Sequence, residues 1–258
     1  MSSDRSALAL VQKLRPGTSG EPLYVMPDIG GNFLYSRLMT RHLAPDRPVF
    51  GLKLPAVPVA KLALQPMEQL ADQLAAALHE ANPSGPHHIL GHSFAGLLAF
   101  ETARALERRG SRAGLVAILD TGVPPGWPRR AFGRVKHAVR HARLLRRRPT
   151  EVSAPDMVLT CPGYATFHLS NHPIAVRDII RALYAMMIAY RPAPYSGPVL
   201  VLRAALPKPT GRPDLGWSRF VAGSVMSADV AADHLGLVRE DAAARQVAEH
   251  IEKALQGQ

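Results

Sequence analysis

One stretch of the chain decides the fold: it reads His88-Ile89-Leu90-Gly91-His92-Ser93-Phe94-Ala95-Gly96-Leu97-Leu98-Ala99-Phe100-Glu101. An apolar run that is typical of a buried strand leads into small residues around a serine, and a helical pattern follows at once. A serine on such a sharp strand-to-helix turn presents its hydroxyl for nucleophilic attack. Gly91 and Ala95 are small enough to let strand and helix approach closely, although Ala95 stands where this pattern usually has glycine. We therefore predict that Ser93 is a catalytic nucleophile.

Short apolar runs and helical patterns alternate on both sides of this stretch. The alternation indicates an α/β architecture, in which helices flank both faces of a mostly parallel central sheet. Functional groups of such folds gather where the parallel strands end. We expect strands at residues 23–26, 49–54, 88–91, 115–119 and 199–202, and helices at 33–43, 67–81, 94–109 and 240–255.

The alternation breaks after Asp120. Residues 124–189 show helical stretches, among them 178–190, but no convincing strand. We predict an α/β core made of residues 1–123 and 190–258, with a helical lid insertion at 124–189 above the catalytic edge of the sheet.

Positive charge is concentrated in one segment. The 258-residue chain has 31 Lys and Arg against 20 Asp and Glu, a formal net charge of +11 at pH 7. Nine of the basic residues and none of the acidic ones lie between Thr121 and Thr150, so the remainder of the chain holds 22 basic and 20 acidic residues. An apolar content of 47% excludes a disordered basic arm. No recognition fold accompanies the charge, so we expect no nucleic-acid partner.

Composition also bears on compartment and on metal binding. Cys161 is the single cysteine, which excludes an intramolecular disulfide and a cysteine-based zinc site and is typical of a reducing compartment. The N-terminus has no apolar core of signal-peptide length, and no apolar run approaches the roughly 18–20 residues of a membrane helix. We expect a cytoplasmic protein with no metal and no integral membrane association, in which Cys161 is inert.

The serine stretch, residues 91–101, resembles the thioesterase domains that terminate non-ribosomal peptide and polyketide synthases, which are α/β-hydrolases. The resemblance covers most of the chain and is weakest between about 125 and 180, where that family has a variable helical lid. The other matching segments are Met26-Pro27-Asp28-Ile29-Gly30-Gly31 (an oxyanion-loop motif), Leu119-Asp120-Thr121 with Pro124 (an acid motif), Tyr190-Arg191-Pro192-Ala193-Pro194-Tyr195 and Asp214-Leu215-Gly216-Trp217 (later markers), and Asp233-His234-Leu235-Gly236-Leu237-Val238 (a histidine motif).

Two aspartates compete for the acid of a catalytic triad. The resemblance implies Asp120 if the chain is a release domain and Asp214 if it is a free-standing editing thioesterase. Asp120 ends a strongly apolar strand, where a buried carboxylate can orient a histidine, whereas Asp214 lies in a loop rich in proline and glycine. We predict Asp120 as the acid, with Asp214 as its rival.

Eleven histidines compete for the general base. His234 lies on an expected loop, residues 230–237, before the final helix, and it follows Ser93 and Asp120 in the chain order of α/β-hydrolases. The others fall within expected helices, at the start of a strand, or in the insertion. His92 directly precedes Ser93 on the sharp strand-to-helix turn, which we call the elbow, and it is expected to have a structural role. We predict His234 as the base.

The resemblance implies a two-step reaction on a thioester. The base takes the proton of Ser93, whose oxygen attacks the carbonyl, while the acid fixes the tautomer of the base. Two backbone N–H groups are expected to stabilise the oxyanion. One is that of Phe94 at the helix N-terminus, and the other belongs to the oxyanion-loop motif at residues 26–31, the first loop, where Asp28 is preferred to Ile29. The pantetheine thiol leaves, and water or a nucleophile of the substrate then resolves the acyl-serine.

Several questions stay open on the sequence alone. It does not distinguish hydrolysis from macrocyclisation, a free-standing protein from a terminal domain, or one acyl chain from another, and it gives no oligomeric state. An ester hydrolase or a serine acyltransferase would use the same triad. A non-catalytic binding protein of the hydrolase fold is disfavoured by the intact set of Ser93, Asp120 and His234.

Residues 131–148 combine an apolar stripe with the basic cluster. The apolar side chains recur at intervals of three and four, as on one face of a helix. Because carrier proteins are typically acidic, we hypothesise that the outer basic face docks an acidic acyl or peptidyl carrier protein through Arg140, Arg143 and Arg147. The substrate would arrive on the carrier's phosphopantetheine, and the chain itself binds no cofactor. A solvated helix face and a membrane-surface helix stay as alternatives.

Overall fold

Seven strands form the central sheet of the computed structural model, which describes residues 7–123, 158–161, 165–209 and 211–257. The sheet has the order β1-β3-β2-β4-β5-β8-β9, and its neighbours are parallel except for β1, which pairs antiparallel with β3 at one edge. The predicted mostly parallel α/β sheet is therefore confirmed. The strands are β1 Val11–Arg15, β2 Leu23–Val25, β3 Val49–Leu52, β4 His87–His92, β5 Ala113–Leu119, β8 Val199–Ala204 and β9 Val225–Val230.

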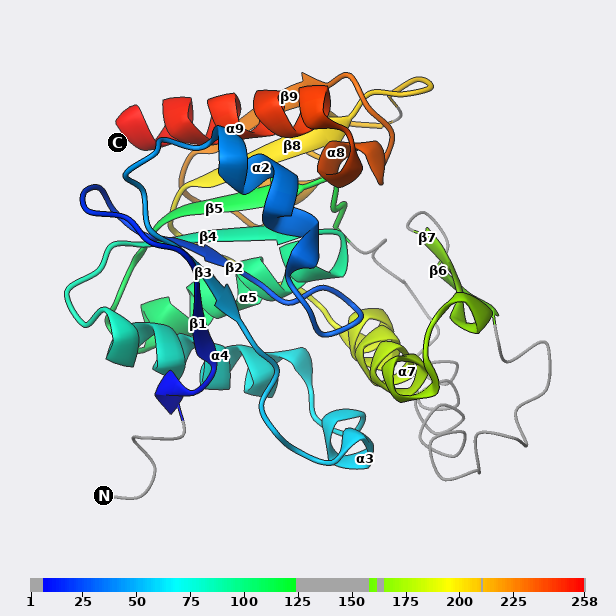
Figure 1. The fold of residues 1–258 in the computed structure, drawn as a ribbon. Coiled ribbons are helices and arrows are strands. Elements are labelled where there is room, and N and C mark those ends of the chain that lie inside the picture. The colour runs from blue at the N-terminus through cyan, green and yellow to red at the C-terminus, as the bar shows by residue number, and fades with distance from the viewer. Residues whose placement is uncertain (1–6, 124–157, 162–164, 210, 258) are drawn as a thin grey trace.

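Helices cover both faces of the sheet (Figure 1). One face carries α4 (Met67–Ala81) and α5 (Phe94–Arg108), and the other carries α2 (Arg37–His42) and α9 (Asp241–Gln256). Successive side chains of a strand point to opposite faces, so a strand that is covered on both sides is apolar throughout. In β5, Val116 packs on the α4–α5 side and Ala117 on the α9 side.

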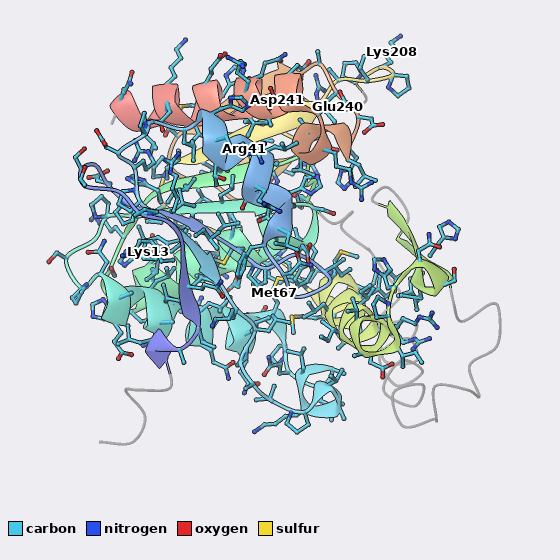
Figure 2. All side chains as sticks on the ribbon, viewed as in Figure 1. Lys13, Arg41, Met67, Lys208, Glu240 and Asp241 are labelled. Atoms are coloured by element: carbon cyan, nitrogen blue, oxygen red, sulfur yellow. The ribbon has the colours of Figure 1, made fainter. Side chains whose placement is uncertain are left out.

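Shorter elements connect these layers. The three-residue turns η1 (Leu34–Ser36) and η5 (Trp217–Arg219) lie in loops, α3 (Val59–Leu62) lies between β3 and α4, and α8 (Gly236–Arg239) follows β9. Charged side chains such as Lys13, Arg41 and Lys208 point outward (Figure 2), whereas Met67 at the start of α4 is buried. Within the described residues, no helix combines the length and the apolar character needed to cross a membrane.

The described part of the insertion differs from its prediction. It contains a two-stranded antiparallel sheet, β6 (Val158–Cys161) with β7 (Ala165–His168), followed by η4 (Leu169–Asn171) and α7 (Ile174–Ala189). The expectation of no strand here was wrong. Among the described residues these four-residue strands pair only with each other, and they carry no long apolar run that would mark them in the sequence. The helix predicted at 178–190 is α7, which begins four residues earlier. The basic stretch 131–148 lies outside the described residues.

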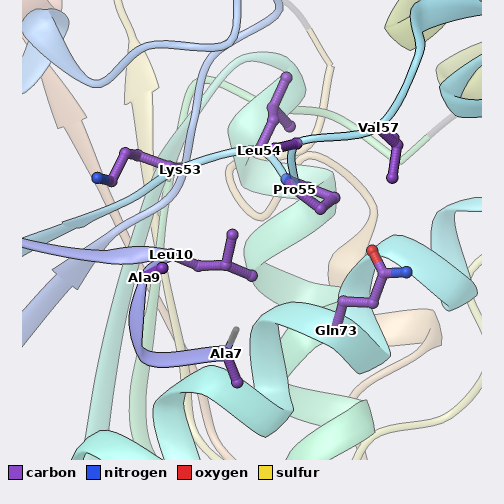
Figure 3. Close-up of a pocket in the computed structure, with 9 residues that line it drawn as sticks. Ala7, Ala9, Leu10, Lys53, Leu54, Pro55, Val57 and Gln73 are labelled. Carbon is purple, nitrogen blue, oxygen red and sulfur yellow. The ribbon is translucent and has the colours of Figure 1, made fainter. Parts of the chain in front are cut away.

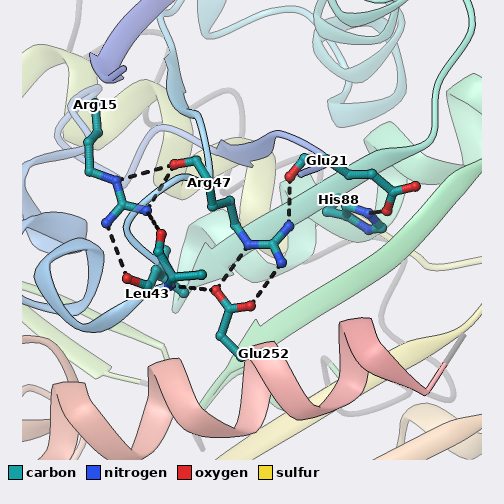
Figure 4. A network of polar contacts seen from close by, with 7 residues as sticks. Arg15, Glu21, Leu43, Arg47, His88 and Glu252 are labelled. Atoms are coloured by element: carbon teal, nitrogen blue, oxygen red, sulfur yellow. Dashed lines mark hydrogen bonds and ion pairs between the residues drawn. The ribbon is translucent and has the colours of Figure 1, made fainter. Parts of the chain in front are cut away.

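A network of polar contacts joins the N-terminal segment to α9 near the N-terminal end of β4 (Figure 4). Arg47 binds Glu252 through two bonds, Nε to Oε1 at 3.0 Å and Nη2 to Oε2 at 2.8 Å, and donates to the Glu21 carbonyl at 2.7 Å. Arg15 donates to backbone carbonyls of residues 40–47, and His88 contacts the Glu21 carboxylate. The contacts join β1, the loop before β3 and the last helix.

Candidate active site

Ser93 lies on a strained turn between β4 and α5. Its φ of 57° and ψ of −124° are costly for a non-glycine residue, and such strain is typical of functional sites. A Cβ atom added to Gly91 would lie 2.0 Å from the Ala95 carbonyl oxygen, so only glycine fits there. A Cβ atom on Gly96 would lie 2.3 Å from Thr121 Oγ1. The helix-side glycine that packing demands is thus the third residue after the serine, and Ala95 is tolerated at the second.

Within the described residues, the first loop, which follows β2, leaves one backbone N–H without an acceptor. The Asp28 N–H donates to the Asn32 carbonyl at 2.6 Å, and the Asp28 carboxylate accepts from the N–H groups of Gly30 and Asn32 at 2.8 and 3.1 Å. Among the described residues the Ile29 N–H has no acceptor. Since the Asp28 N–H is used in folding the loop, the Ile29 N–H is the better candidate of the two expected oxyanion donors. The Phe94 N–H likewise has no acceptor among the described residues, since the first N–H of a helix has no intrahelical partner.

Asp120 and His234 meet at the ends of β5 and β9. His234 Nδ1 lies 2.7 Å from Asp120 Oδ2, and the Ala204 N–H donates to Asp120 Oδ1 at 3.0 Å. Burial raises the pKa of Asp120, but the hydrogen bonds from His234 and Ala204 outweigh burial and hold that pKa below its ordinary value. The carboxylate is therefore charged, which places a proton on Nδ1 of His234 and leaves Nε2 as the acceptor that a general base needs.

The rival acid, Asp214, has a different environment. Its carboxylate accepts from Arg212 Nε at 3.0 Å, from the Gly216 N–H at 3.2 Å and from the Ser218 N–H at 3.0 Å. These bonds hold the turn that leads into η5. No histidine among the described residues bonds to Asp214, so the geometry favours Asp120 as the acid.

Thr121 connects the acid to the elbow. Its hydroxyl lies 2.8 Å from the Ser93 carbonyl oxygen and 3.0 Å from that of Leu119, and the indole N–H of buried Trp217 donates to the Thr121 carbonyl at 2.6 Å. Sequence reasoning gave Thr121 no role of its own. Its role becomes visible only in the fold, where Thr121 approaches Gly96 so closely that a Cβ atom on the helix would not fit.

His92 reaches the loop that carries the base. Its Nε2 lies 2.8 Å from the His234 carbonyl oxygen, and the two rings are 4.5 Å apart. Tyr35 lies on another side, with ring centroids 5.9 Å apart, and donates its hydroxyl proton to the Met26 carbonyl at 2.8 Å. Since His92 directly precedes Ser93, this bond brings the backbone of His234 to the elbow.

Helix α7 lies against the first loop. Val176 Cγ1 is 3.7 Å from the position of a Cβ atom on Gly30, and Ile179 Cγ2 is 3.4 Å from that on Gly31. An apolar helix face thus borders the first loop. Arg140, Arg143 and Arg147, expected to dock a carrier, lie outside the described residues. Cys161 belongs to β6, and its side chain is not described. No group of three or more potential metal ligands occurs in the described part.

A cavity of about 570 Å³ lies on another side of the first loop. It contains none of the predicted catalytic residues, although Leu54, which lines it, also contacts Gly31 of that loop. Figure 3 shows its lining, which is apolar apart from Lys53 and Gln73: Ala7, Ala9, Leu10, Leu54, Pro55, Ala56 and Val57.

Known proteins resemble the chain in sequence and in fold. A family profile described as a thioesterase domain matches residues 21–134. Chondramide synthase cmdD of Chondromyces crocatus is 29% identical over 266 residues, and the match spans 92% of this chain but only 7% of that protein. The thioesterase domain SrfTE, which cyclises the lipopeptide antibiotic surfactin, matches with a TM-score of 0.62 and 15% identity over 96% of each chain. The type II thioesterase BorB of the borrelidin cluster matches with a TM-score of 0.63 and 21% identity, again over 96% of each chain.

Proposed function

We propose, from the match of residues 21–134 to a thioesterase-domain profile, that the chain is a serine thioesterase that releases an acyl, peptidyl or polyketide chain from a carrier-protein phosphopantetheine thioester. The observation that carries the proposal is the His234–Asp120 bond of 2.7 Å, held beside the elbow of Ser93 by the His92 contact. This arrangement supplies a nucleophile, an oriented base and a charged acid at one edge of the sheet.

The reaction follows from proton accounting. His234 Nε2 takes the hydroxyl proton as Ser93 Oγ forms a bond to the thioester carbonyl carbon. The N–H groups of Phe94 and Ile29 stabilise the oxyanion. As the carbon–sulfur bond breaks, His234 returns the proton to the thiolate, which leaves as pantetheine thiol. The acyl group stays on Ser93.

The second half-reaction repeats these steps with a new nucleophile. Water, or a hydroxyl or amine of the acyl chain itself, gives its proton to His234 and attacks the ester, which restores Ser93 and yields an acid or a macrocycle. The cyclising thioesterase domain SrfTE and the type II thioesterase BorB match this chain with TM-scores of 0.62 and 0.63, so the fold does not choose between hydrolysis and macrocyclisation. Both products therefore belong to the proposal. The cytoplasmic location and the acidic carrier partner, with Arg140, Arg143 and Arg147 at the docking face, stay predictions.

One experiment with two substrates tests the proposal. Thiol release is measured from an acyl-pantetheine thioester and from the same acyl group on a carrier protein, and products are identified by mass spectrometry. We expect Ser93→Ala to lower the rate of thiol release at least about a thousandfold on both substrates. Reversing the charge of Arg140, Arg143 and Arg147 should slow only the carrier-bound substrate, and only at low salt, because steering by charge is screened.

The outcomes separate the alternatives. If wild type cleaves an oxygen ester of the same acyl group far faster than the thioester, the ester-hydrolase alternative replaces the proposal. If wild type and Ser93→Ala release thiol at the same rate, the chain is a non-catalytic binding protein of this fold. If the charge reversal leaves carrier-bound turnover unchanged at low salt, the docking hypothesis fails while the thioesterase assignment stands.

A further inference from the structure

We infer that His92, the residue before the nucleophile, is a positioning residue for the general base His234, which it holds through the base's own backbone. The inference rests on the proposed function, since it concerns the same site, and it goes beyond the structural role that the sequence suggested for His92.

The bond has a defined direction. A carbonyl oxygen only accepts hydrogen bonds, so the 2.8 Å contact from His92 Nε2 to the His234 carbonyl requires a proton on that nitrogen. His92 is 5% exposed, and burial together with the neighbouring His234 lowers its pKa to about 3. The ring is therefore neutral at the pH where a thioesterase works, and its single N–H is the one directed at His234.

The base has few other anchors. His234 lies between β9 and α8, where the Asp233 carboxylate and carbonyl accept from the N–H groups of Gly236 and Leu237 at the start of α8. Among the described residues, two hydrogen bonds join residues 233–235 to groups outside this loop and helix: the His234 imidazole donates to Asp120, and the His92 imidazole donates to the His234 carbonyl. One fixes the ring and the other fixes the backbone from which the ring projects.

The ring of His92 is itself held in place. It lies 4.5 Å from the ring of His234 and 5.9 Å from that of Tyr35, whose hydroxyl donates to the Met26 carbonyl where β2 leads into the first loop. His92 thus stands between the oxyanion loop and the base. The bonds to Asp120 and His92 fix both the ring and the backbone of His234, so loss of the His92 donor should leave the base less well positioned.

Two variants of similar size separate the donor from the volume. His92→Gln keeps an N–H donor that can reach the carbonyl, whereas His92→Phe fills the space without one. On an acyl-pantetheine thioester we expect His92→Phe to lower kcat by roughly 10- to 100-fold with KM within about twofold, since misplacement of a catalytic group costs turnover more than binding. His92→Gln should recover kcat to within about fivefold of wild type.

A spectroscopic readout makes the test independent of the substrate. The proton between Asp120 and His234 gives a downfield NMR signal, assigned by its absence in Asp120→Asn. We expect this signal in wild type and His92→Gln, and a broadened or missing signal in His92→Phe. If His92→Phe does not fold, His92→Met serves as the variant without a donor.

The outcomes are distinct. The inference is overturned if the donor-free variant keeps the kcat and the NMR signal of wild type, or if His92→Gln is as impaired as that variant in both measurements. If wild type cleaves no thioester but the signal still depends on the donor at position 92, the proposed function fails and the positioning role stands.

Discussion

At the scale of the residue, Asp120 has the most sharply defined chemistry. Both of its oxygens accept hydrogen bonds, one from the base and one from the end of β8. Its pKa lies below the ordinary value because these two bonds outweigh burial. Ionised Asp120 therefore stabilises the folded state at pH above the unfolded-state pKa, and this contribution is lost as the pH falls through the lower folded-state pKa.

The two candidate acids can be compared by matched variants. We expect Asp120→Asn to lower kcat on an acyl-pantetheine thioester by on the order of 10³–10⁴, because the amide no longer holds the correct tautomer of His234. Asp214→Asn should keep kcat within about threefold but lower the melting temperature, since it weakens three hydrogen bonds of the turn before η5. Loss of turnover in Asp214→Asn, with Asp120→Asn fully active, would refute the assignment.

Which of these residues the sequence could identify depends on distance along the chain. Ser93 and Asp120 carry local signals, a turn of small residues and the end of an apolar strand, and His234 carries chain order. The bond of His92 to His234 joins residues 142 positions apart, and no local pattern encodes it. The choice between Asp28 and Ile29 was equally hidden, because it depends on which N–H the folded loop consumes.

At the scale of the element, burial on both faces made an element predictable. The strands β4, β5 and β8 are covered on both faces, so each forms an apolar run that predicts it from the sequence. The helix predicted at 67–81 coincides with α4. The edge strands β1 and β9 escaped because each carries polar residues on an exposed side, so neither forms an apolar run. Charge and polarity at sheet edges discourage pairing with other chains, and the same feature hides these strands from pattern analysis.

The attachment of α9 gives a prediction at this scale. Removing the carboxylate in Glu252→Ala should lower the free energy of unfolding by about 1–3 kcal/mol, because it breaks the charged bonds to Arg47 and the bond from the Ala44 N–H. Glu249→Ala, exposed on the same helix, should change it by less than about 0.5 kcal/mol. Urea denaturation at pH 7 measures both.

The pH dependence has a definite sign. Burial raises the pKa of Glu252, but the hydrogen bonds from Arg47 and Ala44 outweigh it and hold the pKa below the ordinary value. The stability difference between wild type and Glu252→Ala should therefore be full near neutrality and shrink as the pH falls through the folded-state pKa of Glu252. A difference that stays constant down to acid pH would show that packing, and not charge, links α9 to the loop before β3.

At the scale of the whole molecule, the sheet order explains how distant residues form one site. Ser93 follows β4, Asp120 follows β5 and His234 follows β9, and these parallel strands all end at the same edge. The segment with nine basic residues belongs to the insertion after β5, outside the described residues, so the net charge of +11 is a property of that insertion more than of the core. This basic segment is the proposed carrier-docking face.

The most direct test of the central claim is covalent trapping of the nucleophile. The full chain is incubated with a fluorophosphonate, and the adduct is located by intact-protein and peptide mass spectrometry. We predict a single adduct on Ser93 in wild type and no adduct in Ser93→Ala. An unlabelled wild type, or a Ser93→Ala variant labelled to the same extent, would contradict it.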